Sequence, residues 1–252
     1  MELRSQKATF ALLACLGSLT PALYAQQEFR YDVRHDRFGS RRVGTLVVGE
    51  KSVSFQETAS RPKKNLRAWQ WEYQEVQQLK IAPKSLTVLT YKDNKWKLGA
   101  DREYQFDLLT EKTFEDAYNL LKNRLDQRFV AAIPDRPAAL LWQAPAKHLL
   151  RFGGSDGVLE FGQDAIVYYS SKENESRTWR YQDIEDISTS GPFQLTITTF
   201  ERAKTHYGNL KGFNFQLKKR LEEARYNYIW LRLNQSKGLK ILSSYREGAG
   251  TQ

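Results

Sequence analysis

The chain has 252 residues, with 39 Lys and Arg against 29 Asp and Glu, a formal net charge of +10 and 13% aromatic residues. Its 27% charged and 40% hydrophobic residues are typical of a globular protein and exclude a disordered or low-complexity chain. The basic excess is shared along the chain: residues 28–130 hold 20 basic and 15 acidic side chains (+5), and residues 131–252 hold 17 and 13 (+4).

The first 25 residues have the layout of a secretory signal peptide. Arg4 and Lys7 precede an apolar run over residues 8–16, and small Ala25 offers a cleavage site. The apolar run is shorter than the roughly 20 residues that a membrane span needs. We therefore expect an exported protein, periplasmic or extracellular, whose mature part begins near Gln26.

The only cysteine allows a second interpretation of this segment. Residues 12–15, Leu-Leu-Ala-Cys, resemble a bacterial lipobox, and cleavage before Cys15 would give a lipid-anchored protein. If cleavage instead follows Ala25, the mature part has no cysteine in this sequence. Disulfides and thiolate metal sites are then excluded from it, and its stability must come from apolar cores.

The mature part contains a repeat with an offset near 109 residues. GTLVVGEKSVSFQ from Gly44 matches GVLEFGQDAIVYY from Gly157, and WEYQEV from Trp71 matches WRYQDI from Trp179. Further matches pair SLTVLTY around Leu86 with QLTITTF around Leu195, and YQFDL ending at Leu108 with FNFQL ending at Leu217. The order of the matches predicts two similar units.

Each matched block alternates apolar and polar residues with period two, which predicts half-buried strands. Residues 49–51 and 162–164 separate such runs and predict tight hairpin turns. In the first unit we expect seven strands, near 29–34, 43–49, 51–57, 67–72, 76–82, 85–92 and 103–109.

A segment with helical spacing follows the strands of each unit. In the first unit the expected apolar face consists of Phe114, Ala117, Leu121 and Leu125. In the second unit it consists of Leu221, Ala224, Tyr228 and Leu231.

The units are joined by a segment that contains Pro134, Pro137 and Pro145 and predicts a stiff linker. Its apolar centre, residues 138–142, is expected to pack against a unit. The expected organisation is a signal peptide over 1–25, a first domain over 26–130, a linker over 131–147, a second domain over 148–236 and a flexible tail over 237–252.

Seven strands followed by one C-terminal helix is the order of elements in the pleckstrin-homology (PH) superfold, and the chain resembles tandem PH and GRAM-like domains. The WEYQEV and WRYQDI elements resemble an aromatic-x-Tyr-x-x-Ile element of bacterial PH-like domains. The resemblance implies an α+β, mainly β fold of two tandem PH-like seven-stranded barrels or sandwiches, each closed by a C-terminal helix. It also implies that Trp230 plugs the second barrel, whereas Asn123 stands at the aligned place in the first.

Motifs for catalysis are absent from the sequence. His35, His148 and His206 are the only histidines, and none has the HExxH spacing that gathers metal ligands. No GxSxG, P-loop or GxGxxG motif occurs. We therefore expect no enzyme, no metal and no cofactor, with structural roles for His35 and His148.

The PH topology implies that the loops after strands one, three and six of a unit open at the same end. In the first unit all three are basic, which predicts an anion-binding surface attracted to charged membranes by about 1 kcal/mol per basic residue. An exposed Trp96 would add interfacial anchoring. The surface would comprise Arg37, Arg41, Arg42, Arg61, Lys63, Lys64, Lys92, Lys95, Trp96 and Lys97. Alternatively, these loops are solvated surface that aids solubility.

Three functions remain open at this point. The leading hypothesis is a non-enzymatic exported binding or scaffold protein that contacts a protein or peptide at an exposed sheet edge or helix groove. The second is peripheral binding to an anionic envelope lipid or polysaccharide through the basic loops. The third, a hydrolase, requires a deep pocket at His35 or His148. Nucleic acid is not an expected partner, because no long basic stripe carries interleaved aromatic residues.

Overall fold

A computed structural model describes residues 27–37, 40–58, 66–94, 99–172, 174–203 and 208–235, with only the backbone at Arg37, Ser40 and Arg41. The expected signal peptide and C-terminal tail lie outside these ranges. Neither helix in the described part of the chain has the length and apolarity that a membrane crossing requires.

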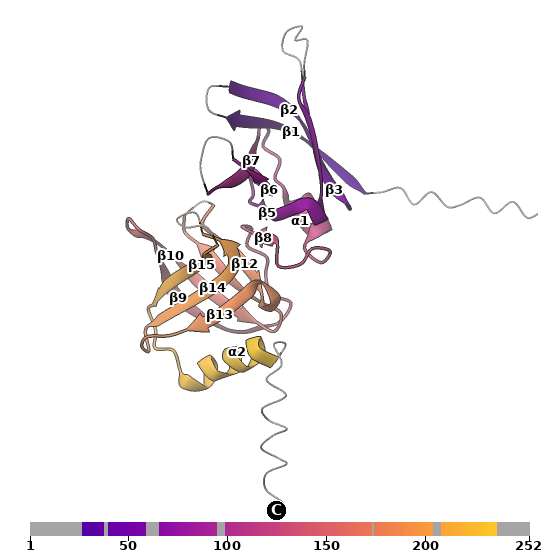
Figure 1. The fold of residues 1–252 in the computed structure, drawn as a ribbon. Coiled ribbons are helices and arrows are strands. Elements are labelled where there is room, and N and C mark those ends of the chain that lie inside the picture. Colours follow the sequence, from indigo (N-terminus) through magenta and orange to yellow (C-terminus); the bar gives the residue numbers. More distant parts are fainter. Residues whose placement is uncertain are drawn as a thin grey trace, which may run out of the picture.

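Two halves with the same succession of elements make up the structure (Figure 1). The first half contains β1 (Glu28–Arg37), β2 (Ser40–Gly49), β3 (Ser52–Glu57), β4 (Ala68–Glu72), β5 (Val76–Ile81), β6 (Ser85–Asp93), β7 (Asp101–Leu108) and α1 (Glu115–Leu121). The second contains β9 (Leu140–Leu149), β10 (Gly154–Gly162), β11 (Ala165–Ser170), β12 (Arg177–Arg180), β13 (Ile184–Ser188), β14 (Gln194–Arg202), β15 (Leu210–Leu217) and α2 (Glu223–Gln235). The seven strands expected in the first unit are present near their expected positions.

The prediction of two closed barrels or sandwiches is wrong. The 15 strands of the described residues form one open sheet in the order β13-β14-β15-β9-β10-β11-β12-β8-β5-β6-β7-β1-β2-β3-β4. The reason is the short strand β8 (Phe129–Ala131), which lies between the halves. It pairs in parallel with β5 and in antiparallel fashion with β12, so it occupies the edges that β4 and β13 would need for closure.

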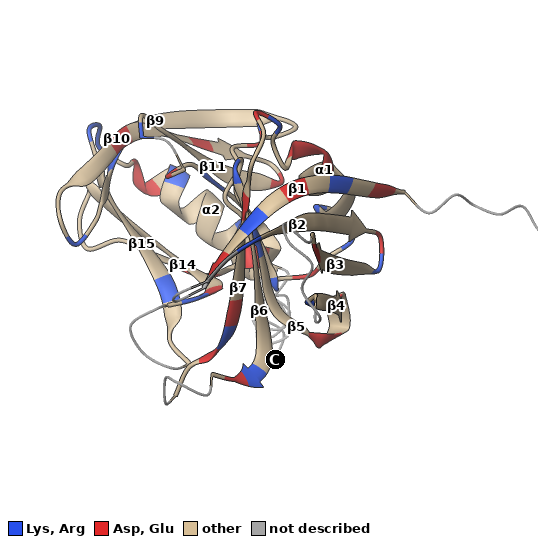
Figure 2. Cartoon of the chain, turned by 90° about the horizontal axis from the view of Figure 1, so that it is seen from above, with Lys and Arg blue, Asp and Glu red and all other residues tan. Residues whose placement is uncertain are grey.

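Each half nevertheless has its own apolar core. One cluster of buried side chains runs from Tyr31 to Ile133 and the other from Ala144 to Leu233. Lys, Arg, Asp and Glu are interspersed over both halves (Figure 2). The inward-facing apolar residues of the strands supply most of both clusters, as period-two alternation predicts.

Residues aligned by the repeat occupy equivalent positions. A Cβ atom on Gly44 would lie 2.2 Å from the carbonyl oxygen of Gln56, and one on Gly157 would lie 2.1 Å from that of Tyr169. Each glycine therefore allows an aromatic ring of the neighbouring strand to pack against the backbone.

Two hydrogen bonds also recur in both halves. The hydroxyls of Tyr73 and Tyr181 donate to the carbonyls of Gly49 and Gly162, at 2.7 and 2.9 Å. Thr90 and Thr199 donate from Oγ1 to the carbonyls of Arg102 and Lys211, at 3.2 and 3.3 Å. The residues that the two copies share thus serve the fold.

The helices meet the expectations unequally. In and around α1, Phe114, Ala117 and Leu121 are buried as predicted, and Leu125 packs against the same cluster. In the second helical segment Leu221, just before α2, is buried as predicted. Within α2 the prediction is wrong, because Ile229 and Leu233 are the buried residues, while Ala224, Tyr228 and Leu231 are exposed. Trp230 is 37% exposed and does not plug a barrel. The helix carries apolar residues on two faces, and spacing alone does not show which face packs.

The proline-rich segment packs on the second half. Residues 132–139 have no regular structure, and β9 begins at Leu140, inside the stretch expected as linker. Thr178 donates from Oγ1 to the carbonyl of Ile133 at 2.7 Å, and the backbone N–H of Asp135 donates back to Oγ1 at 2.8 Å. A Cβ atom on Gly162 would lie 2.2 Å from Cβ of Pro137, so the segment lies directly against β10.

A buried carboxylate joins the halves. Glu201 on β14 is 7% exposed and accepts a hydrogen bond from Nζ of Lys211 at 2.8 Å. Nζ of Lys80, on β5 of the first half, lies 3.6 Å from the same oxygen. Burial alone would raise the pKa of Glu201, but Lys211, Lys80 and Arg177 outweigh it and hold the pKa below its ordinary value.

The next residue adds a second contact between the halves. The guanidinium of Arg202 donates to a carboxylate oxygen of Asp101, at the start of β7, and to Oε1 of Gln77 at 3.1 Å. Nε2 of Gln78 donates to the carbonyl of Phe200 at 3.4 Å. Strand β14 is therefore fixed to the first half along its last residues.

We predict that Glu201→Gln destabilises the protein strongly, because it leaves two half-buried lysines beside a neutral group. The expected loss is about 3 kcal/mol, or roughly 6–12 °C in Tm. Calorimetry of the wild type and the variant measures it. The matched control is Glu222→Gln, whose side chain is 62% exposed and pairs with Arg225; it should cost under about 1 kcal/mol. Equal Tm changes for both variants would contradict the role of Glu201.

Candidate functional site

The structure describes the side chains of two of the ten residues expected to bind anions, Arg42 and Lys92. Arg37 and Arg41 lie at the ends of β1 and β2, where only the backbone is described. The others lie outside the described residues: Arg61, Lys63, Lys64, Lys95, Trp96 and Lys97.

Arg42 already serves the fold. Its NH1 donates to Oε2 of the buried Glu57 at 3.2 Å, and the backbone N–H of Arg67 donates to the same oxygen at 3.1 Å. The guanidinium also lies 6.0 Å from the centre of the Trp69 ring. Its charge is therefore partly neutralised by Glu57, and its plane packs on an aromatic side chain.

Lys92 is exposed, and strand register relates it to the other basic loops. The pairings Arg37↔Ser40, Glu57↔Gly44 and Asp93↔Asp101 link the relevant strand ends. Because β1 also pairs with β7 in antiparallel fashion, the C-terminal ends of β1, β3 and β6 lie on the same side of the sheet, where its strands end. The three basic loops begin on this side.

An aromatic box surrounds His35, which is 4% exposed. Its ring centre lies 5.3 Å from those of Trp69 and Phe106 and 5.9 Å from that of Tyr104. Nδ1 lies 2.8 Å from the carbonyl oxygen of Gln105, which requires a proton on this nitrogen. Packing and this bond account for His35 as a structural residue.

His148 stands at the equivalent place in the second half and is 6% exposed. Its ring lies 5.1 Å from Phe215 and 5.6 Å from Phe213. Burial lowers its pKa to about 4, although Oε2 of Glu175, 3.9 Å from Nδ1, acts in the opposite direction. The imidazole is therefore neutral at pH 7.

Arg177 lies beside His148 and is 7% exposed. Its NH1 donates to the carbonyls of Asn174 and Ser176, at 3.1 and 2.8 Å, and its guanidinium lies 5.9 Å from the Phe213 ring. Arg177 thus braces the loop between β11 and β12. The end of the second half that corresponds to the basic loops of the first therefore contains Arg177 and Glu201, and it contacts the first half through Glu201.

The two edge strands of the sheet, β4 and β13, differ in their protection. Along β13, the hydroxyl of Tyr226 on α2 donates to the carbonyl of Ile187 at 3.1 Å. In the part of the chain that the structure describes, no strand pairs with β4 on the side away from β3. A backbone edge of this kind is a site where a further strand can add.

The register of β4 shows which residues face the open side. The bonds from the N–H of Glu57 to the carbonyl of Arg67 (2.8 Å) and from the N–H of Tyr73 to that of Lys51 (3.2 Å) fix the alternation. Odd-numbered residues of β4 therefore bond to β3, and the even-numbered ones direct N–H and C=O outward. The outward residues are Ala68, Gln70 and Glu72, and all three are exposed.

Within the described ranges, no group of three or more His, Cys, Asp or Glu side chains could hold a metal ion.

Comparisons with known proteins give no family. The chain matches no family model and no curated protein. Among solved structures, it is similar to the C-terminal domain of an unknown protein from Leishmania infantum, with TM-score 0.29 and 13% identity over 38% of this chain and 84% of that one. It is also similar to the Spt16D–Pob3N heterodimer, which has a PH-like fold, with TM-score 0.29 and 13% identity over 68% of this chain and 82% of that one. The structure is a largely β sheet, and likenesses at this TM-score identify neither its fold family nor its function.

Sequence reasoning missed the charged residues between the halves. Arg177, Glu201 and Lys211 all stand at positions whose strand neighbours two residues away face the core, such as Trp179 and Phe213. The sequence signal that could have revealed them is a charged residue at a position where the alternation of the strand predicts an inward-facing side chain.

We predict that His148 makes stability depend on pH below neutrality. An unfolded chain binds a proton to this histidine near its ordinary pKa of about 6.5, whereas the folded chain binds it only near pH 4, so stability falls as the pH is lowered between these values. His148→Phe, which keeps an aromatic ring beside Phe213 and Phe215, should flatten the loss of Tm between pH 6.5 and 5.

The control for this titration is Asn227→Ala, which changes an exposed residue of α2 and no titrating group. It should leave the slope of Tm against pH unchanged. If the His148→Phe variant showed the slope of the wild type, His148 would not be the group that titrates.

Proposed function

We propose that this chain is a non-enzymatic exported binding protein that takes up an extended peptide along the edge of β4. The observation that carries the proposal is the outward row of backbone groups on Ala68, Gln70 and Glu72. Alternating N–H and C=O groups on an open edge are complementary to another polypeptide strand.

Side chains beside this edge indicate what kind of peptide would fit. Trp69 is half-buried and Leu66 is 41% exposed, so the neighbourhood offers apolar contacts. In the sequence, Arg61, Lys63 and Lys64 shortly precede the strand. These features favour an extended segment that combines apolar and acidic residues.

The test removes one outward donor. Gln70→Pro deletes a backbone N–H that makes no bond to β3, and proline is tolerated at such edge positions, so the fold should persist. Gln70→Ala removes the side chain but keeps the N–H. Mature wild-type and variant proteins are immobilised, and polypeptides captured from the native envelope fraction are quantified by mass spectrometry.

We expect a polypeptide that the wild type and Gln70→Ala retain equally and that Gln70→Pro retains about tenfold less, the equivalent of about 1.4 kcal/mol. Tm values show whether each variant is folded. Equal retention by the folded Gln70→Pro variant would refute strand addition at β4.

The second candidate function is peripheral attachment to an anionic envelope lipid or polysaccharide. This function is favoured because β1, β3 and β6 end on the same side of the sheet and Lys92 is exposed there. The basic loops would then act together, because each charge near an anionic surface contributes about 1 kcal/mol.

Vesicle sedimentation tests this candidate. Wild-type protein should sediment with phosphatidylglycerol vesicles and stay in solution with phosphatidylcholine vesicles. Changing Lys63, Lys64, Lys95 and Lys97 together to Glu should abolish sedimentation. The matched control changes Lys219, Arg220, Arg225 and Arg232, on and before α2, to Glu; if it lost binding equally, overall charge rather than these loops would be responsible.

A further inference from the structure

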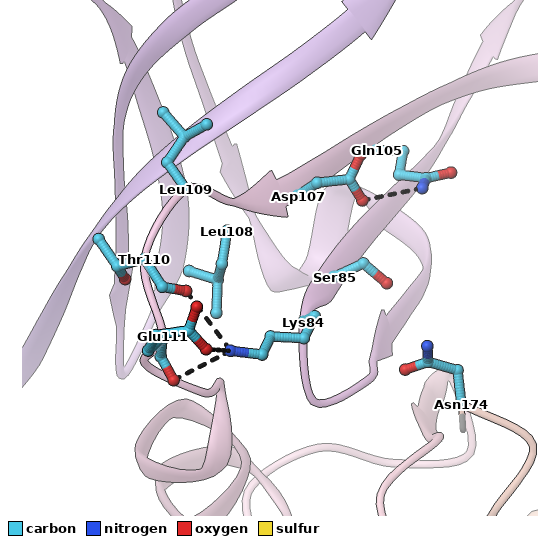
Figure 3. Close-up of a pocket in the computed structure, with 9 residues that line it drawn as sticks. All are labelled: Lys84, Ser85, Gln105, Asp107, Leu108, Leu109, Thr110, Glu111 and Asn174. Atoms are coloured by element: carbon cyan, nitrogen blue, oxygen red, sulfur yellow. Dashed lines mark hydrogen bonds and ion pairs between the residues drawn. The ribbon is translucent and has the colours of Figure 1, made fainter. Parts of the chain in front are cut away.

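A cleft of about 470 Å³ lies between the halves (Figure 3). First-half residues from the turn before β6, from β6 and β7, and from the loop after β7 form most of it, and Asn174 from the second half completes it. We propose that this cleft binds a neutral polyhydroxylated ligand, of the chemical class of a mono- or disaccharide. This binding would be additional to strand uptake at β4.

Lys84 fixes one wall. Its Nζ donates to the carbonyls of Glu111 (2.9 Å), Lys112 (3.2 Å) and Thr110 (3.5 Å), and lies 3.4 Å from Oε2 of Glu111. These bonds hold the loop after β7 in one conformation. They also engage the ammonium group, so Lys84 does not offer an open anion site.

Asn174 is held in place from the opposite side. Its φ of 63° lies in the left-handed region, and no other non-glycine residue in the described ranges has a positive φ. The carbonyl of Asn174 accepts a hydrogen bond from the buried Arg177 at 3.1 Å, which fixes the backbone in this conformation. Figure 3 shows the amide of Asn174 and the hydroxyl of Ser85 turned toward each other across the cleft.

The lining has little net charge. Asp107 lies 3.9 Å from NH2 of Arg34, and Glu111 is paired with Lys84. An ionic ligand would gain little from such a lining. Mixed neutral donors and acceptors therefore determine what the cleft can recognise.

The polar groups suit adjacent hydroxyls. Nε2 of Gln105 donates to Oδ1 of Asp107 at 3.0 Å, which orients the amide and leaves its oxygen directed away from that carboxylate. Ser85, Thr110 and Asn174 supply further donors and acceptors. Leu109, 47% exposed, offers an apolar surface for the C–H face of a sugar ring. Amide, hydroxyl and carboxylate groups beside an apolar surface match the chemistry of a saccharide.

The experiment is saturation-transfer NMR on the mature protein with glucose, galactose, mannose, N-acetylglucosamine and their β-linked disaccharides at about 10 mM. We expect at least one to bind with a Kd in the millimolar range, where shallow polar sites lie. Asn174→Gly removes the amide and is tolerated at positive φ, so it should weaken binding at least about fivefold without unfolding the protein.

Asn227→Ala, on the exposed surface of α2, is the matched control and should bind as the wild type does. Ser85→Ala removes a second polar group of the cleft and should also weaken saccharide binding. Gln70→Pro should bind the saccharide normally, which separates this proposal from strand uptake. The proposal is overturned if none of these sugars shows transfer, if Asn174→Gly binds like the wild type, or if phosphorylated or sulfated sugars bind more tightly than neutral ones.

Discussion

Three consecutive residues, Phe129, Val130 and Ala131, determine how the two halves are connected. As β8 they pair with β5 on one side and with β12 on the other, and all three side chains are buried. In a seven-stranded unit of this order, β5 would have to meet β4, and β12 would have to meet β13, for the sheet to close. Because β8 takes both positions, neither half closes, and the strand pairing continues from the first half into the second.

The same strand decides which edges remain open. With β5 and β12 satisfied, β4 and β13 become the two ends of a 15-stranded sheet. Helix α2 lies beside β13 and bonds to it through Tyr226, whereas α1 is only seven residues long and packs into the first core. The proposed peptide edge at β4 is thus a consequence of a pairing on the far side of the same half.

Local pattern predicted most of the elements because the alternation of apolar residues is a property of each strand alone. It could not predict closure, which depends on a pairing between Leu79 and Phe129, 50 positions apart, inside a stretch without strand alternation. It also failed for α2, where two apolar faces compete and only the position of β13 decides between them. For the expected anion site, strand register shows that the three basic loops begin on the same side of the sheet. One of the expected residues, Arg42, is paired with Glu57.

The differences between the copies follow from how the halves meet. Thr90 and Thr199 make the same bond, yet two residues later the first copy has exposed Lys92 and the second has buried Glu201. The charge of the buried Glu201 is matched by Lys211 of its own half, at 2.8 Å, and across the junction by Lys80 of the first half, at 3.6 Å. In the second copy the end of β14 therefore contacts the first copy. The second copy also contributes Asn174 to the cleft between the halves. The first copy has exposed Lys92 near the end of β6 and, within the described residues, an edge of β4 with which no further strand pairs, which is why both functions proposed for this chain fall on its first half.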